Sequence, residues 1–349
     1  MSTYNRFATP RAYVDMIQYN LANGWRDLDD ITTIQDDGST AVTFDAGSEA
    51  SMFDGRPANY AQIAHDTKSF YIQFNTGFTT DTLAESNYIA ILNHNMHDAD
   101  AVFVVEIGDQ ADGSDFTKIS TTGSHTKLIN ADANDTAGEI DPGDNGWTLI
   151  TWSKKTSDNQ YVRITFSDDN GTAQNFSEDL VIGSIQYGEY IDFPSVDMNI
   201  TTSIDYEGVK LQRSLGGNVY SSMTSMGAPT WDSTNPFNTA TTANEQTYTF
   251  KRRHGRVRHS MTMSHIADTT LWASAMQGVQ ASKFYDAETL HSNFYNKVMG
   301  QHLPFLFTID STSTEEGDYG MFRLDDSTFS AQQTLHRMWT VKMDLVEDW

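Results

Sequence analysis

The sequence predicts a mainly β protein made of two β-sandwich or jelly-roll domains, with a short N-terminal helix and one or two helices in the C-terminal half. Three observations predict this class. Short apolar segments alternate with period two, Gly, Asn, Asp and Ser separate them at close intervals, and few segments show helical spacing. Many short strands with frequent turns are typical of antiparallel sandwiches rather than of alternating β-α-β units.

The predicted strands share alternating apolar side chains and flanking turn residues. They are residues 70–74, 88–93, 101–107, 147–152, 161–166, 180–187, 248–250, 257–265, 303–309, 321–324 and 339–346. Because the turns between them are short, we expect most neighbouring strands to pair antiparallel.

The first predicted helix covers residues 10–22. Pro10 suits the first helical position, and Tyr13, Ile17 and Leu21 then recur at a spacing of four. Such spacing places the three side chains on one face, so we expect a short amphipathic helix.

Two further helical segments are predicted in the C-terminal half. Asp286 is placed to cap a segment in which Leu290, Phe294 and Val298 share one face. A shorter helical stretch is predicted at residues 268–277.

The domain organisation is predicted from breaks in the strand pattern. Residues 1–24 form an N-terminal segment, residues 25–194 a jelly-roll domain and residues 195–349 a second β-sandwich domain, because the strand-rich run ends at a proline-broken connector.

Residues 221–246 are rich in Ser, Thr, Asn and Ala. This stretch is too long for a hairpin loop, and we interpret it as an arm that reaches a neighbouring subunit.

Composition narrows the classes of function. The chain has 349 residues, 22 Lys plus Arg, 47 Asp plus Glu and no cysteine, which gives a formal charge of −25. Without cysteine it forms no disulfide, thiolate metal site or cysteine nucleophile. The acidic balance disfavours nucleic-acid binding, since phosphate contacts need clustered positive charge. We also expect no export signal and no membrane anchor, because the longest apolar runs are far shorter than the roughly 18 residues of a membrane span.

Two imidazoles lie close together in the segment that contains His94 and His97, followed by Asp98. Two histidines and a carboxylate are a known metal-ligand set. Residues three apart on a strand point to opposite faces, however, so metal binding is the less favoured alternative. We favour a structural interpretation in which Asn93 and His94 end a buried strand and hydrogen-bond the turn that follows.

A second segment matches part of a calcium-binding loop. Asn130, Asp132, Asn134, Thr136 and Asp141 fall at positions 1, 3, 5, 7 and 12 of that template. The sixth position lacks the turn glycine, and neither flank looks helical. We favour a solvated acidic loop, with calcium binding as the alternative.

Positive charge gathers in one segment, where five of the 22 basic residues fall between positions 251 and 259. A turn at Gly255 with alternation on both sides predicts a hairpin whose arginines pair with carboxylates of another region or another copy. The predicted interface arginines are Arg252, Arg253, Arg256 and Arg258. One alternative is a nucleic-acid-binding patch, but the segment lacks stacking aromatics and the negative charge of the whole chain repels nucleic acid. A plain solvated face is another alternative.

No catalytic constellation is evident. The phosphate-binding, nucleophile-elbow and zinc-protease motifs are missing from the sequence. Paired carboxylates such as Asp168 and Asp169 sit in turns, where Asp bonds its own backbone, so a glycosidase remains an alternative only. We predict no catalytic residue, no enzyme activity and no cofactor.

The order of blocks in the sequence resembles a known group of proteins. Residues 86–96 (SNYIAILNHNM), 147–152 (WTLITW), 161–166 (YVRITF) and 182–190 (IGSIQYGEY) resemble a jelly-roll module of tailed-phage structural proteins, similar in strand pattern to discoidin-type, galactose-binding-like sandwiches. Residues 205–210 (DYEGVK), Gly216-Gly217, residues 301–307 (QHLPFLF) and residues 339–349 resemble virion proteins of marine tailed bacteriophages.

The resemblance implies a virion structural protein that is assembled in the host bacterial cytoplasm, most plausibly a tail or distal-tail component. Its partners would be other copies of itself and neighbouring virion proteins, with a host-surface glycan as a further partner and with neither nucleic acid nor membrane. Besides the arginines, Trp231, Phe237 and Trp349 are predicted at interfaces. The alternatives are a capsid decoration or head-fibre protein, a glycan-binding adhesin and an enzyme acting on the cell envelope.

Overall fold

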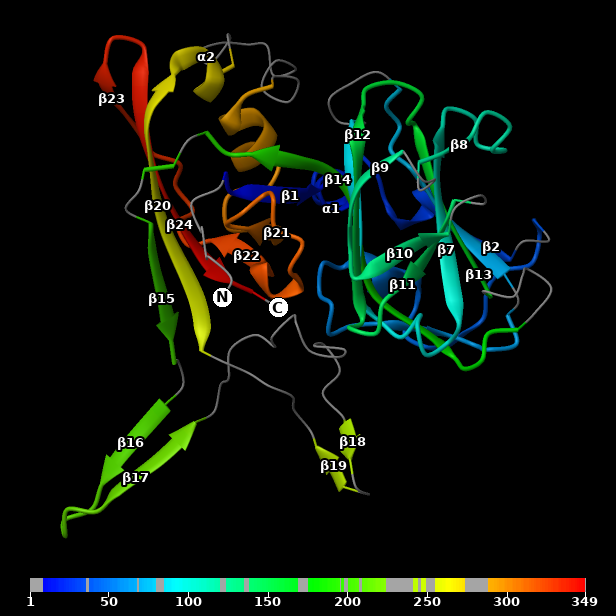
Figure 1. The fold of residues 1–349 in the computed structure, drawn as a ribbon, viewed down its shortest axis with the longest axis horizontal. Coiled ribbons are helices and arrows are strands. Elements are labelled where there is room, and N and C mark those ends of the chain that lie inside the picture. Colours follow the sequence, from blue (N-terminus) through cyan, green and yellow to red (C-terminus); the bar gives the residue numbers. More distant parts are fainter. Residues whose placement is uncertain are drawn as a thin grey trace.

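The computed structural model describes most of the chain. The described residues are 9–35, 38–67, 69–79, 85–119, 124–134, 138–168, 175–194, 196–197, 200–206, 209–223, 241–243, 246–248, 255–273 and 288–348. Within them the protein is mainly β, as predicted, and its strands form two large antiparallel sheets and two separate hairpins (Figure 1). Among these residues, no helix has both the length and the apolar character needed to cross a membrane.

The larger sheet has thirteen strands within the described residues and runs through both halves of the molecule (Figure 1). Its main path is β15 (Thr201–Asp205), β20 (Arg256–Ala267), β24 (Met338–Glu347), β22 (Tyr319–Leu324), β21 (Phe305–Thr308), β1 (Arg11–Asp15), β14 (Leu180–Asp192), β6 (Ser86–His94), β12 (Trp147–Lys155) and β9 (His125–Ile129). Off this path lie β23 (Ala331–Leu335), β3 (Phe44–Ala46) and β4 (Ala61–Ile63).

The second sheet covers one face of the first and completes a sandwich. Among the described residues it contains β10 (Ala131–Asn134), β11 (Glu139–Pro142), β7 (Ala101–Gly108), β13 (Tyr161–Asp168), β5 (Ser69–Asn75), β2 (Ile31–Gln35) and β8 (Thr117–Lys118). The side chains between the two sheets form the first core, in which Phe70, Phe103 and Phe166 are fully buried. Alternating inward and outward residues produce this packing, since successive side chains of a strand point to opposite faces.

Strand β14 joins the two halves. Its thirteen residues pair with β6 and β4 near one end and with β1 near the other. Ile185 and Tyr187 enter the first core, and the half-buried Ile191 packs against the second. A single strand therefore contributes side chains to both cores.

The second core lies between the sheet and short helices. Phe305, Phe307 and Val341 are buried in it, together with Ala12 and Val14 of β1. The N-terminal strand thus belongs to the second core, although it is far from that core in sequence.

Among the described residues, the helices of the C-terminal half are α2 (Asp268–Leu271), η3 (His291–Asn296, of π type) and η4 (Glu316–Asp318). The helix predicted at residues 268–277 is confirmed only over α2, since Trp272 and Ala273 are not helical and residues 274–277 lie outside the described residues. The sequence did not predict η4. Leu290, Phe294 and Val298 are buried in the second core, as their spacing predicted. The predicted cap Asp286 lies outside the described residues. Two further short 3-10 helices, η1 (Leu28–Asp30) and η2 (Glu49–Phe53), belong to the first half.

The prediction of a helix over residues 10–22 is wrong in its first part. Residues Arg11–Asp15 form β1, and the helix α1 covers only Met16–Ala22. β1 is flanked on one side by β14 and on the other by β21, so two ladders outweigh the local helical spacing. The helix then begins at Asp15, whose Oδ1 accepts hydrogen bonds from the amides of Ile17 (2.9 Å) and Gln18 (3.3 Å).

The strand predictions are confirmed where the structure describes them. Ten of the eleven predicted segments lie largely in strands of the two large sheets. The remaining one, residues 248–250, begins at the last residue of β19 and continues outside the described residues. The two hairpins are β16 (Val209–Arg213) with β17 (Val219–Met223), and β18 (Thr241–Ala243) with β19 (Gln246–Tyr248).

Asp15 makes the fold sensitive to pH. Burial raises the pKa of its carboxyl group to about 7. The unfolded chain releases this proton near pH 4, whereas the folded chain holds it until about pH 7. The contribution of Asp15 to stability is therefore fully present below pH 4 and is lost as the pH rises to about 7, by at most about 4 kcal/mol.

We predict that Asp15→Asn, which keeps a capping side chain without a charge, becomes more stable relative to the wild type as the pH rises from 4 to 8. Urea unfolding at several pH values measures this difference. Asp27→Asn is the matched control, because Asp27 caps η1 with an exposed carboxylate. A difference between Asp15→Asn and the wild type that does not change with pH would contradict the prediction.

Candidate functional site

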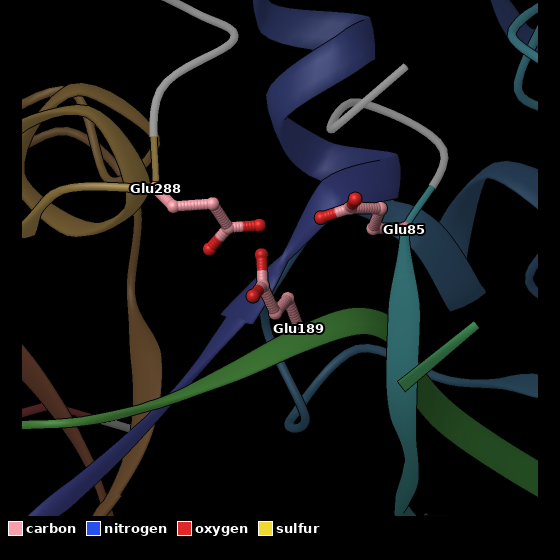
Figure 2. Close-up of side chains that lie close together, drawn as sticks. All are labelled: Glu85, Glu189 and Glu288. Atoms are coloured by element: carbon pink, nitrogen blue, oxygen red, sulfur yellow. The ribbon is translucent and has the colours of Figure 1, made fainter. Parts of the chain in front are cut away.

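A cluster of charged side chains lies where the two halves meet. The carboxylates of Glu85, Glu189 and Glu288 point toward one another (Figure 2). Nζ of Lys154 lies 2.7 Å from an oxygen of Glu85 and 2.7 Å from an oxygen of Glu189, and it also pairs with Glu288. Nζ of Lys297 lies 3.3 Å from the other oxygen of Glu189.

These side chains come from four separate parts of the fold. Glu85 directly precedes β6, Glu189 lies in β14 and Glu288 precedes η3 (Figure 2). Lys154 lies in β12. Glu189 and Val14 face each other across the β14–β1 ladder, on the side of the sheet that carries the second core. The alternation of β14 thus directs one carboxylate into the junction.

Lys154 is the cation that all three carboxylates of this cluster share. Burial raises the pKa of Glu85. Burial also opposes the ionisation of Glu288, but the ion pair with Lys154 outweighs it and holds the pKa of Glu288 below its ordinary value. Burial similarly opposes the charge of Lys154, and the surrounding carboxylates more than compensate, so the pKa of Lys154 is raised.

Three carboxylates in this arrangement are a candidate metal site, and among the described residues they form the group with suitable geometry. The ammonium of Lys154, however, already occupies the point on which the carboxylates converge. We therefore interpret the cluster as an internal ion-pair network that fastens the two halves together.

The hairpin β16–β17, here called the arm, carries exposed apolar side chains and projects away from both large sheets (Figure 1). Leu211 is 67% exposed and Val219 is 54% exposed, although both are large apolar residues. The ladder pairs Arg213 with Val219 and Gln212 with Tyr220, so directly opposed residues share a face.

The two faces of the arm differ in character. Val209, Leu211 and Val219 lie on one face, together with Arg213 at its end and Ser221, and we call it the apolar face of the arm. Lys210, Gln212, Tyr220 and Ser222 lie on the other. Such alternation is typical of a two-stranded ribbon that buries one face against another surface. In the single chain, however, the side chains of the apolar face are exposed.

Two adjoining cavities open beside the loop between β22 and β23. They have volumes of about 320 and 300 Å³. Both are lined by Tyr295, Leu324, Asp326 and Phe329. We call these two cavities together the Phe329 hollow.

The arginine-rich segment is only partly described. Arg256 and Arg258 lie in β20, which pairs with β15 and β24. Arg258 makes ion pairs with Asp205 (3.6 Å) and Asp325 (2.8 Å) of the same chain, so it uses carboxylates of other regions. The other predicted interface residues lie outside the described residues: Arg252, Arg253, Trp231, Phe237 and Trp349.

The residues matched to a calcium loop lie mostly on a ladder. Asp132 of β10 and Asp141 of β11 are opposite each other, and Asn134 is opposite Glu139. Asn130 precedes β10 and donates a hydrogen bond from Nδ2 to the carbonyl of Trp147 at 2.6 Å. The interpretation that we favoured, a solvated acidic loop, is therefore wrong where these residues pair as two strands, and calcium binding stays an untested alternative.

His94 has the structural role that we favoured. Its Nε2 lies 3.0 Å from Oγ1 of Thr148, and its Nδ1 accepts a hydrogen bond from the amide of Met96. Burial lowers the pKa of His94 to about 3, so the imidazole is neutral near pH 7.

Sequence reasoning missed both the charge cluster and the arm. The five charged residues of the cluster are scattered from position 85 to position 297, and no local pattern links them. The arm had a signal, because Val209 and Leu211 alternate with polar residues before the Gly216-Gly217 turn. The arm predicted from the sequence, residues 221–246, begins within β17, and its residues 224–240 and 244–245 lie outside the described residues.

Comparisons with known proteins gave only structural similarities. No family model and no curated protein matches the chain. A chitosan-binding module of a chitosanase/glucanase from Paenibacillus sp. IK-5 covers 46% of this chain and 93% of its own, with 14% identity and a TM-score of 0.30. A pectin-binding carbohydrate binding module covers 43% and 90%, with 16% identity and a TM-score of 0.26. The CBM32 of AlyQ, in complex with 4,5-unsaturated mannuronic acid, covers 42% and 92%, with 15% identity and a TM-score of 0.24. At these scores the similarities assign neither a function nor a site residue to this chain.

We predict that Lys154→Met destabilises the protein by about 2 to 3 kcal/mol, because removal of the ammonium leaves partly buried carboxylates without their shared partner. Urea unfolding at pH 7 measures the change. Lys342→Met is the control, since Lys342 is an exposed lysine paired with Asp344, and its loss should destabilise the protein far less than the loss of Lys154. Equal effects of the two substitutions would contradict the fastening role of the cluster.

Proposed function

We propose that this protein is a structural subunit that works by assembly, and that its arm packs against a second copy of the same chain. The observation that carries the proposal is the exposed apolar face of the arm. A two-stranded hairpin alone is marginally stable in water, and an amphipathic one needs a covering surface. A neighbouring subunit supplies such a surface.

The exposed apolar area suits an interface of ordinary size. Six large apolar residues of the arm and of the segment before it, leaving out Tyr220 on the other face of the ladder, are at least 42% exposed: Ile204, Tyr206, Val209, Leu211, Leu215 and Val219. At such fractions each exposes on the order of 100 Å², so together they supply most of the roughly 800 Å² that each partner contributes to a standard interface.

The charge distribution favours a second copy of the same chain as the partner that covers the apolar face of the arm. Residues 209–223 contain Lys210 and Arg213 but no Asp or Glu, so the arm carries a charge of +2. Because the whole chain carries −25, the remainder carries −27. A cationic apolar ribbon and an acidic body attract each other, whereas two acidic bodies without such an arm repel.

The place of this assembly is proposed from the sequence resemblance. We propose a virion subunit in a tail or distal tail, with a capsid decoration or head fibre as the alternative location. In either place the protein acts by burying surface between copies and neighbours, without turnover. Mass spectrometry of purified particles would find the chain as a stoichiometric component if the proposal is right.

The arm is tested by introducing negative charge on one face at a time. We predict that Leu211→Glu with Val219→Glu, on the apolar face, converts an oligomer into a monomer in sedimentation velocity. Gln212→Glu with Ser222→Glu is the matched control, because it adds the same charge to the polar face of the same ladder. A wild-type chain that stays monomeric at high concentration, or equal effects of both double variants, would overturn the proposal.

Glycan binding is a second candidate function. The observation that favours it is the Phe329 hollow, which combines an aromatic ring with many uncharged polar groups. It is compatible with the assembly role, since the arm and the hollow share no residue.

A further inference from the structure

We propose that the Phe329 hollow is a binding site for a neutral carbohydrate chain, with Phe329 as the platform between two adjoining sugar subsites. The two cavities flank this one side chain, and their volumes of about 320 and 300 Å³ each reach the lower end of the range for small-molecule sites, roughly 300 to 1,000 Å³. A chain that crosses the ring would place one unit in each cavity.

Other aromatic side chains hold the platform in place. The ring centre of Phe329 lies 4.3 Å from that of Tyr295, 5.1 Å from that of His291 and 5.2 Å from that of Trp272. Phe329 itself is partly exposed, whereas Tyr295 is buried. A ring that packs against neighbouring aromatic side chains and is itself partly exposed offers an apolar surface to the C–H face of a pyranose.

The hydroxyl of Tyr295 provides an unused hydrogen-bonding group at the centre of the site. Tyr295 is 8% exposed and lines both cavities, and its hydroxyl has no partner among the described residues. Leaving such a group unpaired is unfavourable, because its hydrogen bonds to water are lost on burial without replacement. A sugar hydroxyl that reaches this buried oxygen from either cavity would satisfy it.

The walls select an uncharged ligand. In the first cavity they include the amide of Asn296 and the hydroxyl of Ser327, and in the second they include the side chains of Gln332 and Thr340. The carboxylate of Asp326 lines both cavities and repels an anionic sugar. Lys342 in the second cavity is already paired with Asp344 at 2.8 Å, which reduces its attraction for an anion.

Calorimetric titration of the full chain with neutral glucose hexamers, one series β-1,4-linked and one α-1,4-linked, tests the proposal. We expect saturable binding of at least one series and at least tenfold weaker binding of a galacturonate hexamer. Phe329→Ala should weaken binding of the neutral sugar by at least tenfold. Tyr295→Phe, which keeps the buried ring, should weaken it by about three- to tenfold.

Matched controls separate this site from other surfaces. Tyr60→Ala removes another exposed aromatic residue and should leave binding unchanged. The double variant of the apolar face of the arm should also bind the sugar as the wild type does, so failure of the assembly proposal leaves this one intact. No saturable binding of either neutral series, preferential binding of the galacturonate, or unchanged binding in both Phe329→Ala and Tyr295→Phe would overturn the proposal.

Discussion

The pairing of β14 with β6 on one side and with β1 on the other is the constraint on which the rest of the structure depends. Because these ladders are continuous, the two halves share one sheet rather than being joined by a flexible linker. The same strand places Glu189 at the junction, where Lys154 and Lys297 neutralise it. Backbone hydrogen bonds and a partly buried ion network therefore hold the halves in one arrangement.

This rigid body leaves two features without an internal role. The arm extends beyond the sheets and exposes an apolar face that no described residue of the chain covers. The Phe329 hollow lies in the second half, where a loop and a helix meet the sheet. A subunit that is fixed by its neighbours through the arm would present the hollow in a constant orientation, so assembly and glycan binding would support each other.

Local patterns in the sequence predicted the strands well because alternation is a property of residues two apart. Residues 147–152 and 161–166 read as strands and are strands. The failure at residues 10–22 has the opposite cause. Their spacing of four is compatible with a helix, but Arg11–Asp15 gain two ladders with segments about 180 and 295 positions away, which no local pattern records.

The sequence by itself determined the mainly β class, the position of most strands, the acidic charge and the absence of cysteine chemistry, since these depend on composition or on neighbours within a few residues. Only the tertiary structure decided that one sheet passes through both halves, that Lys154 meets three glutamates and that Tyr295 lies beneath Phe329. Each of these depends on contacts between residues distant in the chain, and the energy of such a contact exists only after the chain has folded.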